Sequence, residues 1–275
     1  VIDLSAGMKI DQVFLVSDKD MSTATSGQQY IRCYLRDKTG QMNARQWQAT
    51  PRMYEQLPSP GFARISGRVE DYRGNLQFII EAAKPMDTGS VDTAEFMPVS
   101  ALDIDEMWKR TLVVLRTVKQ PALLQMIDKF VKDDVLMTKF RRVPAAVSMH
   151  HAFIGGLIEH TLSLLELADK IRPHYPQLDW DLILTALFLH DIGKCEELSC
   201  DVGFEYTDVG QLVGHIVIAT NWIQQKADEI TAETDKPFPQ QLLAKLKHLI
   251  LAHHGSYEFG TPKLPAMAEA FLIHH

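Results

Sequence analysis

The sequence predicts a two-domain protein in which a small all-β barrel is followed by an all-α helical bundle. Apolar residues recur with a period of two in residues 12–84, and with helical spacing from residue 105 onward. Residues 85–100 are rich in Pro, Gly, Ser, Thr and Asp and show no sustained period, which is typical of a linker. The predicted boundaries are residues 1–85 for the barrel, 86–104 for the linker and 105–275 for the bundle.

The first domain is expected to contain five short strands and one short helix. In residues 30–36, Ile31, Cys33 and Leu35 point to one face of a strand, and Tyr and Arg residues alternate with them. A turn at Asp37–Gly40 leads into the next strand. A helix is expected at 51–57, and a hairpin with strands at 62–70 and 76–81. This β-β-β-α-β-β order fits a five-stranded OB-fold barrel, with other small barrels as alternatives.

One face of this predicted sheet alternates aromatic and basic side chains. The candidates for base stacking and phosphate contact are Tyr34, Arg36, Arg45, Trp47, Tyr72 and Arg73. Stacking of a base on an aromatic ring contributes about 1–3 kcal/mol and tolerates any base, which favours binding of single-stranded nucleic acid. The alternative is that this face packs against the helical domain or another subunit.

Charge and histidine are unevenly distributed along the chain. The net charge is -7, yet residues 1–85 carry 11 Lys+Arg against 9 Asp+Glu, whereas residues 86–275 carry 17 against 26. The acidity therefore belongs to the second domain and does not exclude a nucleic-acid partner for the first. All 11 histidines lie at or after His150, which points to a histidine-based site in the helical domain.

Neither a membrane span nor a disulfide framework is expected. No apolar run approaches the roughly 18 residues of a membrane helix, and the N-terminus lacks the features of a signal peptide. Three cysteines, Cys33, Cys195 and Cys200, are too few and too scattered for a disulfide scaffold. We expect a cytoplasmic protein.

Inward-facing histidines characterise the predicted bundle. One helix contains Trp108, Leu112 and Leu115, and further helices are expected at 121–130, 155–171, 180–191, 209–230 and 239–254. Histidines lie on or near the apolar side of four of them, at His160, His190, His215 and His253. A single inward histidine is usually structural, but four of them beside the carboxylate of Asp191 are better explained by shared metal coordination. Imidazole and carboxylate suit Mn, Fe, Co, Ni or Zn, and a carboxylate can bridge two ions.

The order of these residues resembles the HD-domain metal-dependent phosphohydrolases. The surrounding motifs narrow the resemblance to the YhaM-type bacterial 3′-to-5′ exoribonucleases, in which an N-terminal OB-fold precedes an HD domain. The motifs are Pro144-Ala145-Ala146, His150-His151, Gly155-Gly156-Leu157-Ile158-Glu159-His160-Thr161, His190-Asp191-Ile192-Gly193-Lys194, Phe204-Glu205-Tyr206-Thr207, Gly214-His215 and His253-His254-Gly255, with Asp37–Gly40 and Tyr72–Gln77 in the first domain.

The resemblance implies two divalent metal ions bridged by Asp191. Mn²⁺ is the first choice, with Fe, Co, Ni, Mg and Zn as alternatives. The implied ligands are His160, His190, Asp191, His215, His253 and His254, and the choice between the last two stays open. An HD domain normally closes its site with a further Asp after an apolar stretch like residues 270–274, so we expect the chain to be truncated at its C-terminus. Whether that Asp lies beyond His275 or has been lost stays open.

Two further residues are catalytic candidates beside Asp191. Lys194 could contact the scissile phosphate, or it could be a solvated lysine at a helix end. His151, together with His150, could bind phosphate or protonate the leaving group. The alternative for these two histidines is a packing pair between helices.

The resemblance implies a metal-dependent 3′-to-5′ exoribonuclease that hydrolyses single-stranded RNA to nucleoside monophosphates through a metal-activated water, with single-stranded DNA as a further candidate substrate. A phosphohydrolase of small nucleotides, with the OB-fold as a regulatory or oligomerisation module, is the second hypothesis, because fold does not settle substrate. An RNA-binding adaptor with a decayed metal site is the third. Homo-oligomerisation stays open.

Overall fold

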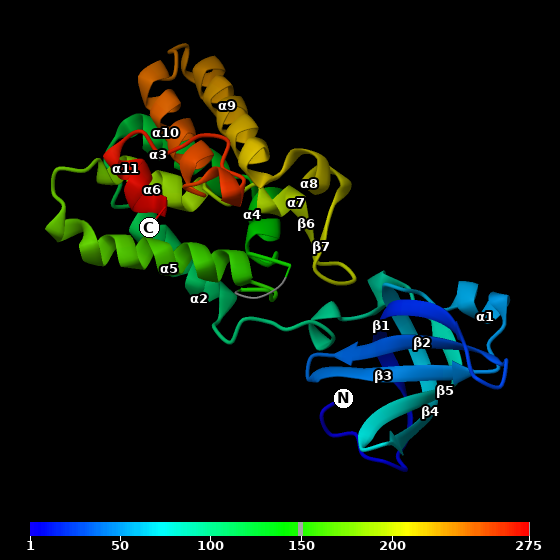
Figure 1. Cartoon of the computed structure of the whole chain (residues 1–275). Coiled ribbons are helices and arrows are strands. Elements are labelled where there is room, and N and C mark those ends of the chain that lie inside the picture. The colour runs from blue at the N-terminus through cyan, green and yellow to red at the C-terminus, as the bar shows by residue number, and fades with distance from the viewer. Residues whose placement is uncertain (148–150, 275) are drawn as a thin grey trace. The chain divides into compact units, whose positions relative to one another are not determined.

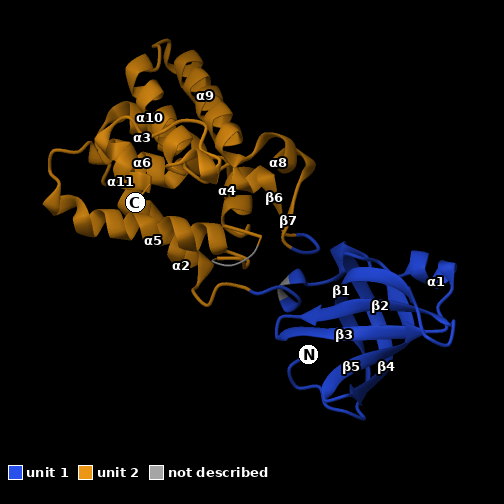
Figure 2. Cartoon of the chain, viewed as in Figure 1, with its two compact units in different colours: residues 1–98, 201–203 blue, residues 99–200, 204–275 orange. Residues whose placement is uncertain are grey.

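The computed structural model describes residues 1–147 and 151–274. The chain divides into two compact units, residues 1–98 with 201–203 and residues 99–200 with 204–275 (Figure 2). The first unit contains the β-barrel and the second is helical (Figure 1). Residues 86–98, expected to belong to the linker, form two short turns of 3-10 helix, η1 (Thr88–Ser90) and η2 (Thr93–Glu95), within the first unit.

The first unit is the predicted five-stranded OB-fold barrel. Its elements are β1 (Lys9–Thr23), β2 (Gln29–Asp37), β3 (Gly40–Trp47), α1 (Pro51–Gln56), β4 (Gly61–Tyr72) and β5 (Asn75–Pro85). The strands close a barrel in the order β1-β2-β3-β5-β4, with β1 pairing antiparallel to β4 and β3 parallel to β5. Closure leaves no exposed edge along the paired segments.

Strict alternation along β2 and β3 separates the barrel core from the outer face. Ile31, Cys33 and Leu35 are buried, as is Ala44 on the neighbouring strand, so the predicted inner face is confirmed. The β4–β5 hairpin turns through Arg73 and Gly74, both in the left-handed region at φ +55° and +80°. Such a two-residue turn matches the twist of the strands, and it presents the Arg73 side chain at the end of the hairpin.

The second unit is the predicted helical bundle, with one small β-hairpin that was not predicted. Its elements are α2 (Ile104–Leu115), α3 (Pro121–Val131), α4 (Asp134–Phe140), α5 (Gly156–Ile171), η3 (Arg172–His174), α6 (Trp180–Leu189), α7 (Lys194–Glu197), β6 (Leu198–Ser199), β7 (Glu205–Tyr206), α8 (Asp208–Val213), α9 (His215–Thr234), α10 (Gln240–Ala252), η4 (Tyr257–Phe259) and α11 (Ala268–His274). Aspartates cap α2, α4 and α6 through their side chains, which satisfies backbone N–H groups at those helix starts. Apart from half-buried Asp181, every residue of α6 is buried, so this helix forms the centre of the bundle.

The single helix predicted at 209–230 is wrong. The structure has two helices there, α8 and α9, because Gly214 adopts φ +77° and breaks the hydrogen-bonding pattern between them. Leu212, which was expected on the same apolar stripe as His215, is 85% exposed. His215 is instead the first residue of α9, and its position is set by the break at Gly214. The structure also adds α4, which the apolar spacing did not predict.

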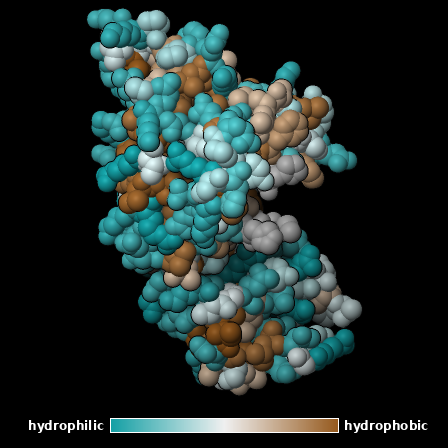
Figure 3. Space-filling view, turned by 90° about the vertical axis from the view of Figure 1, so that its left-hand side faces the viewer, coloured by the Kyte–Doolittle hydropathy of each residue, from teal (hydrophilic) through white to brown (hydrophobic). Residues whose placement is uncertain are grey.

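The surface is of mixed hydropathy and the three cysteines are free. No described helix is both long and apolar enough to cross a bilayer. On the face drawn in Figure 3, apolar side chains form separate patches among hydrophilic ones. No disulfide joins Cys33, Cys195 and Cys200, which all lie buried in the described part of the chain.

Candidate metal centre

Four helices of the second unit bring imidazoles to one place. His160 comes from the second turn of α5, His190 and Asp191 directly follow α6, His215 begins α9, and His253 follows α10. Neighbouring rings are close: the ring centroids of His160 and His190 are 5.3 Å apart, those of His190 and His253 5.2 Å, and those of His215 and His253 5.8 Å. The histidines predicted to meet therefore do so.

The two carboxylate oxygens of Asp191 face two different groups of histidines. Oδ2 lies 3.6 Å from His160 Nε2 and 3.3 Å from His190 Nε2. Oδ1 lies 3.4 Å from His215 Nε2 and 3.6 Å from His253 Nε2. Donor atoms that share one ion at roughly 2.0–2.2 Å lie about 3–3.6 Å apart, so each oxygen fits an ion position of its own. The two oxygens of Asp191 therefore face separate groups of histidine donors.

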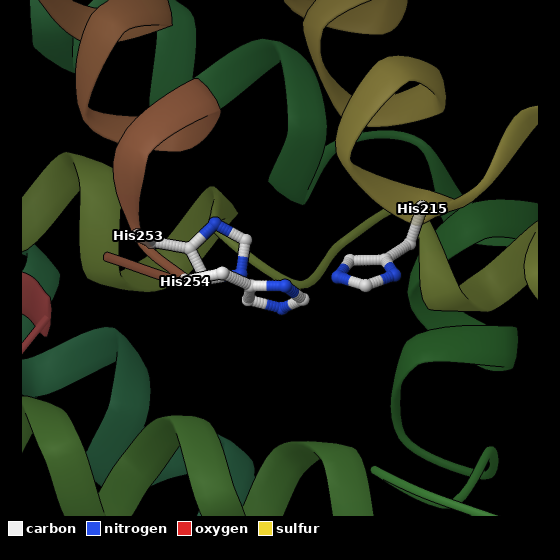
Figure 4. A group of neighbouring side chains, drawn as sticks. All are labelled: His215, His253 and His254. Atoms are coloured by element: carbon white, nitrogen blue, oxygen red, sulfur yellow. The ribbon is translucent and has the colours of Figure 1, made fainter. Parts of the chain in front are cut away.

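Two clusters of three donors result. One consists of His160, His190 and Asp191, and the other of His215, His253 and His254. Figure 4 shows the second cluster, in which the rings from the end of α10 face the His215 ring at the start of α9. Both His253 and His254 lie in the second cluster, and the choice between them as a ligand stays a prediction.

Hydrogen bonds on the far side of each ring orient these imidazoles. The Nδ1 atom of His190 lies 2.8 Å from the Leu187 carbonyl oxygen, and that of His253 lies 2.7 Å from the Ile250 carbonyl oxygen. A carbonyl can only accept, so each Nδ1 must donate its N–H, which leaves the Nε2 lone pair facing the centre. Such partners fix both the tautomer and the orientation of metal-binding histidines.

Glu197 holds His215 in the same way, and the sequence analysis missed it. Its buried carboxylate accepts hydrogen bonds from the His215 backbone N–H at 2.9 Å and from His215 Nδ1 at 3.0 Å. These bonds hold the pKa of the Glu197 carboxyl below its usual value, against the opposing effect of burial. The available signal was a second acidic residue in Cys195-Glu196-Glu197, but nothing local shows which of the two glutamates turns inward.

Three buried atoms at the centre test whether a metal fits. Among the residues that the structure describes, Asp191 Oδ1, His215 Nε2 and His253 Nε2 have no hydrogen-bond partner. Leaving such atoms unpaired in the interior costs free energy unless an ion or water satisfies them. All three are donors suited to a divalent cation, and they converge on one place, so the residues present fit a metal.

The protonation states also suit metal binding. Burial, assisted by the neighbouring His190, lowers the pKa of His160 to about 4, and burial lowers that of His253 to about 4. Both imidazoles are therefore neutral at pH 7, which is the form that binds metal. Burial acts to raise the pKa of Asp191, but Lys194 and His190 outweigh it and hold the pKa well below its usual value. The carboxylate is ionised.

The two other catalytic candidates lie at the same centre. Lys194 is not a solvated lysine, since its side chain is 16% exposed and its ammonium group lies 2.7 Å from Asp191 Oδ2. His151 lies beside His160, with ring centroids 5.5 Å apart, and its Nδ1 is 3.7 Å from the Glu159 carboxylate. His150 lies outside the described residues.

Two glycines allow the chain to approach this closely. A Cβ on Gly193 would lie 2.1 Å from the His215 carbonyl oxygen, and one on Gly156 would lie 2.0 Å from the His151 carbonyl oxygen. Both distances are far shorter than a van der Waals contact. Gly193 therefore lets α7 touch the start of α9, and Gly156 lets the segment at His151 pack on the start of α5.

The barrel brings together only some of the residues predicted to bind nucleic acid. The Arg45 guanidinium lies over the rings of Trp47 and Tyr72, 5.7 and 5.6 Å from their centroids, and Arg73 lies 5.3 Å from the Tyr72 ring. The sequence analysis did not select Tyr30, whose ring stacks against Trp47 at 4.9 Å. We call Tyr30, Arg45, Trp47, Tyr72 and Arg73 the aromatic cluster.

Tyr34 and Arg36 lie further along β2, outside the contacts of the aromatic cluster. In the β2–β3 ladder Tyr34 pairs with Asn43, two residues before Arg45. Arg36 lies 3.5 Å from the Asp18 carboxylate on β1. That ion pair neutralises a charge that had been assigned to phosphate.

A family model and several solved structures are similar to parts of this chain. Residues 157–270 match the HD domain family. The second OB-fold domain of replication protein A from Methanococcus maripaludis is 16% identical and covers 32% of this chain and 92% of its own, with a TM-score of 0.26. The protein PriB from Ralstonia solanacearum is 11% identical and covers 29% of this chain and 97% of its own, also at 0.26.

Two curated relatives match nearly the whole chain. The 3′-5′ exoribonuclease YhaM of Bacillus velezensis is 32% identical over 270 residues, which cover 98% of this chain and 83% of that protein. The 3′-5′ exoribonuclease YhaM of Halalkalibacterium halodurans is 31% identical over 275 residues, covering 100% of this chain and 83% of that protein. Since the similarity spans both the barrel and the histidine centre, this chain belongs to the YhaM family of HD-domain exoribonucleases.

Proposed function

We propose that this chain shortens single-stranded RNA from its 3′ end in a metal-dependent hydrolysis that releases nucleoside monophosphates. The observation that carries the proposal is the environment of the Asp191 carboxylate. Each of its two oxygens lies 3.3–3.6 Å from the Nε2 atoms of two histidines. This centre lies in a chain similar throughout its length to YhaM exoribonucleases.

The proposed ligands divide between the two oxygens of Asp191. His160 and His190 serve the position at Oδ2, and His215, His253 and His254 serve the position at Oδ1. Two divalent ions bound there would supply activation of water and neutralisation of charge on the phosphate. Among the candidate ions we propose Mn²⁺ first, as the family resemblance implies. Imidazole and carboxylate donors do not single out one ion, so Fe, Co, Ni, Mg and Zn are the other candidates for a metal panel.

Three residues around the ligands have distinct proposed roles. Lys194 is anchored to Asp191 and places a positive charge where the scissile phosphate must approach. His151, beside His160, is placed to interact with the phosphate or the leaving oxygen. Glu197 positions His215 through Nδ1 and so directs its Nε2 atom toward the centre.

The aromatic cluster is proposed to bind the upstream part of the strand. Trp47 and Tyr72 are 38% and 46% exposed, so their rings are available for stacking, and Arg45 and Arg73 add positive charge beside them. This mode of binding is independent of sequence and disfavours duplexes, whose bases are already stacked. Single-stranded DNA would bind to the same groups. A cytoplasmic location and homo-oligomerisation stay predictions.

We expect a descending ladder of products from 5′-labelled RNA that has a single-stranded 3′ tail leading into a stable hairpin. Shortening should begin at the 3′ end, release mononucleotides and stop near the duplex, because only a flexible single strand can lie across the stacking rings. Polyacrylamide gels of a time course with metal-loaded protein measure this. Internal fragments at early times would contradict the proposal, as would release of the labelled 5′ nucleotide or activity confined to small nucleotides.

We expect Glu197→Gln to weaken metal binding by about 10- to 100-fold, the usual effect of removing a partner of a metal-bound histidine. The amide can still accept one hydrogen bond from His215 but no longer stabilises the imidazole with a negative charge. Titration with Mn²⁺ against a competing chelator measures the affinity. The control is Glu196→Gln, since the neighbouring Glu196 is exposed and pairs with Lys139 at 3.3 Å. Equal affinities for the two variants would contradict the role of Glu197.

A further inference from the structure

A short turn after the metal centre exposes two aromatic rings. The segment η4 follows His253 and His254 closely, and its Tyr257 and Phe259 are 67% and 66% exposed. Neither ring belongs to the aromatic cluster of the barrel, and neither contributes to the core of the helical unit. Large aromatic side chains usually bury most of their surface, so this pair requires an explanation.

Hydrogen bonds hold the turn in a defined shape. Ser256 caps η4 by accepting a bond from the Glu258 N–H at 3.2 Å, and Gly260 ends it at φ +78°, donating its N–H to the Tyr257 carbonyl at 3.1 Å. The buried hydroxyl of Thr261 lies 2.8 Å from the Leu251 carbonyl oxygen, which ties the end of the turn back to α10. The rings are therefore presented by fixed backbone.

The turn is also joined directly to the metal centre. The Nδ1 atom of His254 lies 2.6 Å from the Phe259 carbonyl oxygen, so this ring donates its N–H to the turn. The Nε2 atom of the same ring is in the donor cluster with His215 and His253. The His254 ring therefore links the Phe259 backbone to the donor cluster, which places η4 next to the proposed ion position.

The chemistry of the site decides what could cover these rings. A nucleotide held by its phosphate at the centre carries a flat base on a short sugar arm, and a base is the group that stacks well on exposed Tyr and Phe. Stacking on these rings would not depend on the identity of the base, since every base has a π face. A polar or charged ligand would instead require polar side chains at these two positions.

We propose that Tyr257 and Phe259 form a stacking site for the bases at the 3′ end of the strand, next to the bond that is hydrolysed. This inference rests on the proposed function and adds a second binding element to it. The barrel would hold the upstream strand, and the turn would hold the terminal bases in register with the metal centre. Without the turn, the terminal phosphate would be bound less often in the reactive position.

The direct test uses RNA with 2-aminopurine at the 3′-terminal position and a hydrolysis-resistant methylene phosphonate as its last linkage. Stacking quenches 2-aminopurine, so metal-loaded wild-type protein should quench the emission, and Tyr257→Ala and Phe259→Ala should restore much of it. Variants that keep an aromatic ring, Tyr257→Phe and Phe259→Trp, should quench like wild type. Quenching that is unchanged in both alanine variants would overturn the proposal.

The kinetic test compares ordinary RNA with RNA whose 3′-terminal nucleotide is abasic. On ordinary RNA, we expect Phe259→Ala to lower kcat/KM by about 5- to 150-fold, the equivalent of one lost stacking contact. On the abasic substrate this loss should nearly disappear, because wild type no longer has a base to stack. The control is Tyr175→Ala, another exposed tyrosine, which lies beyond the far end of α5 from His160.

The remaining outcomes separate this inference from the proposed function. If wild-type protein fails to shorten RNA at all, the proposed function fails before any variant is compared. If wild type shortens RNA and Phe259→Ala loses the same factor on both substrates, the turn does not bind the terminal base and the inference alone is overturned. A change of oligomeric state in the alanine variants, measured by sedimentation, would assign the rings to a contact between copies and would also overturn it.

Discussion

Asp191→Asn and His190→Ala are each expected to lower the rate of RNA shortening by about three orders of magnitude or more, with the helical fold retained. The carboxylate has one oxygen toward each donor cluster, so its replacement removes a ligand from both proposed ion positions at once. An asparagine has the same shape but no charge, and it binds divalent cations far less strongly. Both the activation of water and the neutralisation of the phosphate charge are then lost.

Three measurements on purified protein check this expectation. End-labelled RNA gives the rate, elemental analysis gives the bound metal, and circular dichroism gives the helical content. Asp169→Asn is the control, because this aspartate is exposed on α5, away from the donor clusters. A wild-type protein that retains full activity in excess chelator would contradict the metal mechanism, as would an Asp191→Asn variant with wild-type rate.

The second large effect is expected from the aromatic cluster of the barrel. Tyr30→Ala and Trp47→Ala should each weaken binding of a long single strand by about 5- to 150-fold, because each removes a ring available to a base. Hydrolysis of a dinucleotide should change little, since a dinucleotide is too short to need the upstream site. The loss should therefore appear mainly in KM for long RNA rather than in kcat.

Fluorescence anisotropy with labelled single strands measures the binding. Initial rates on long RNA and on a dinucleotide show whether KM or kcat changes, and on which substrate. A matched pair of arginine variants sharpens the comparison. Arg45 lies over the rings of the cluster, whereas Arg64 pairs with Asp11 outside it, so Arg45→Ala should weaken binding more than Arg64→Ala. Equal losses on long RNA and dinucleotide would instead assign the cluster a structural role.

The sequence by itself was sufficient to locate most of the metal centre. His160, His190, Asp191 and His253 could be selected because each stands on or next to an apolar helical stripe, where an isolated polar group is unfavourable. His215 was selected for a partly wrong reason. A single helix would place Leu212 on the same side as His215, but the break at Gly214 places Leu212 on a separate helix and makes His215 the start of α9.

Residues that orient a candidate ligand could not be found from the spacing of apolar residues. Glu197 and the neighbouring Glu196 are chemically identical, and only the packing of α7 against the start of α9 turns one inward and leaves the other exposed. The same holds in the barrel. Alternation along β2 and β3 placed Tyr34, Arg36 and Arg45 on one outer face, but Tyr30 joined the cluster and Arg36 paired with Asp18 because of the register between strands.

What the sequence determined by itself was therefore the identity of most of the elements and, within them, the face on which most side chains lie. Both follow from periodicity, which is a local property of the chain: two residues in a strand and 3.6 in a helix. Only the tertiary structure decided which oxygen of Asp191 meets which histidine, which glutamate supports His215 and which rings meet on the barrel. Those contacts join residues far apart in the chain, and their distances depend on helix packing and strand register, which no local pattern encodes.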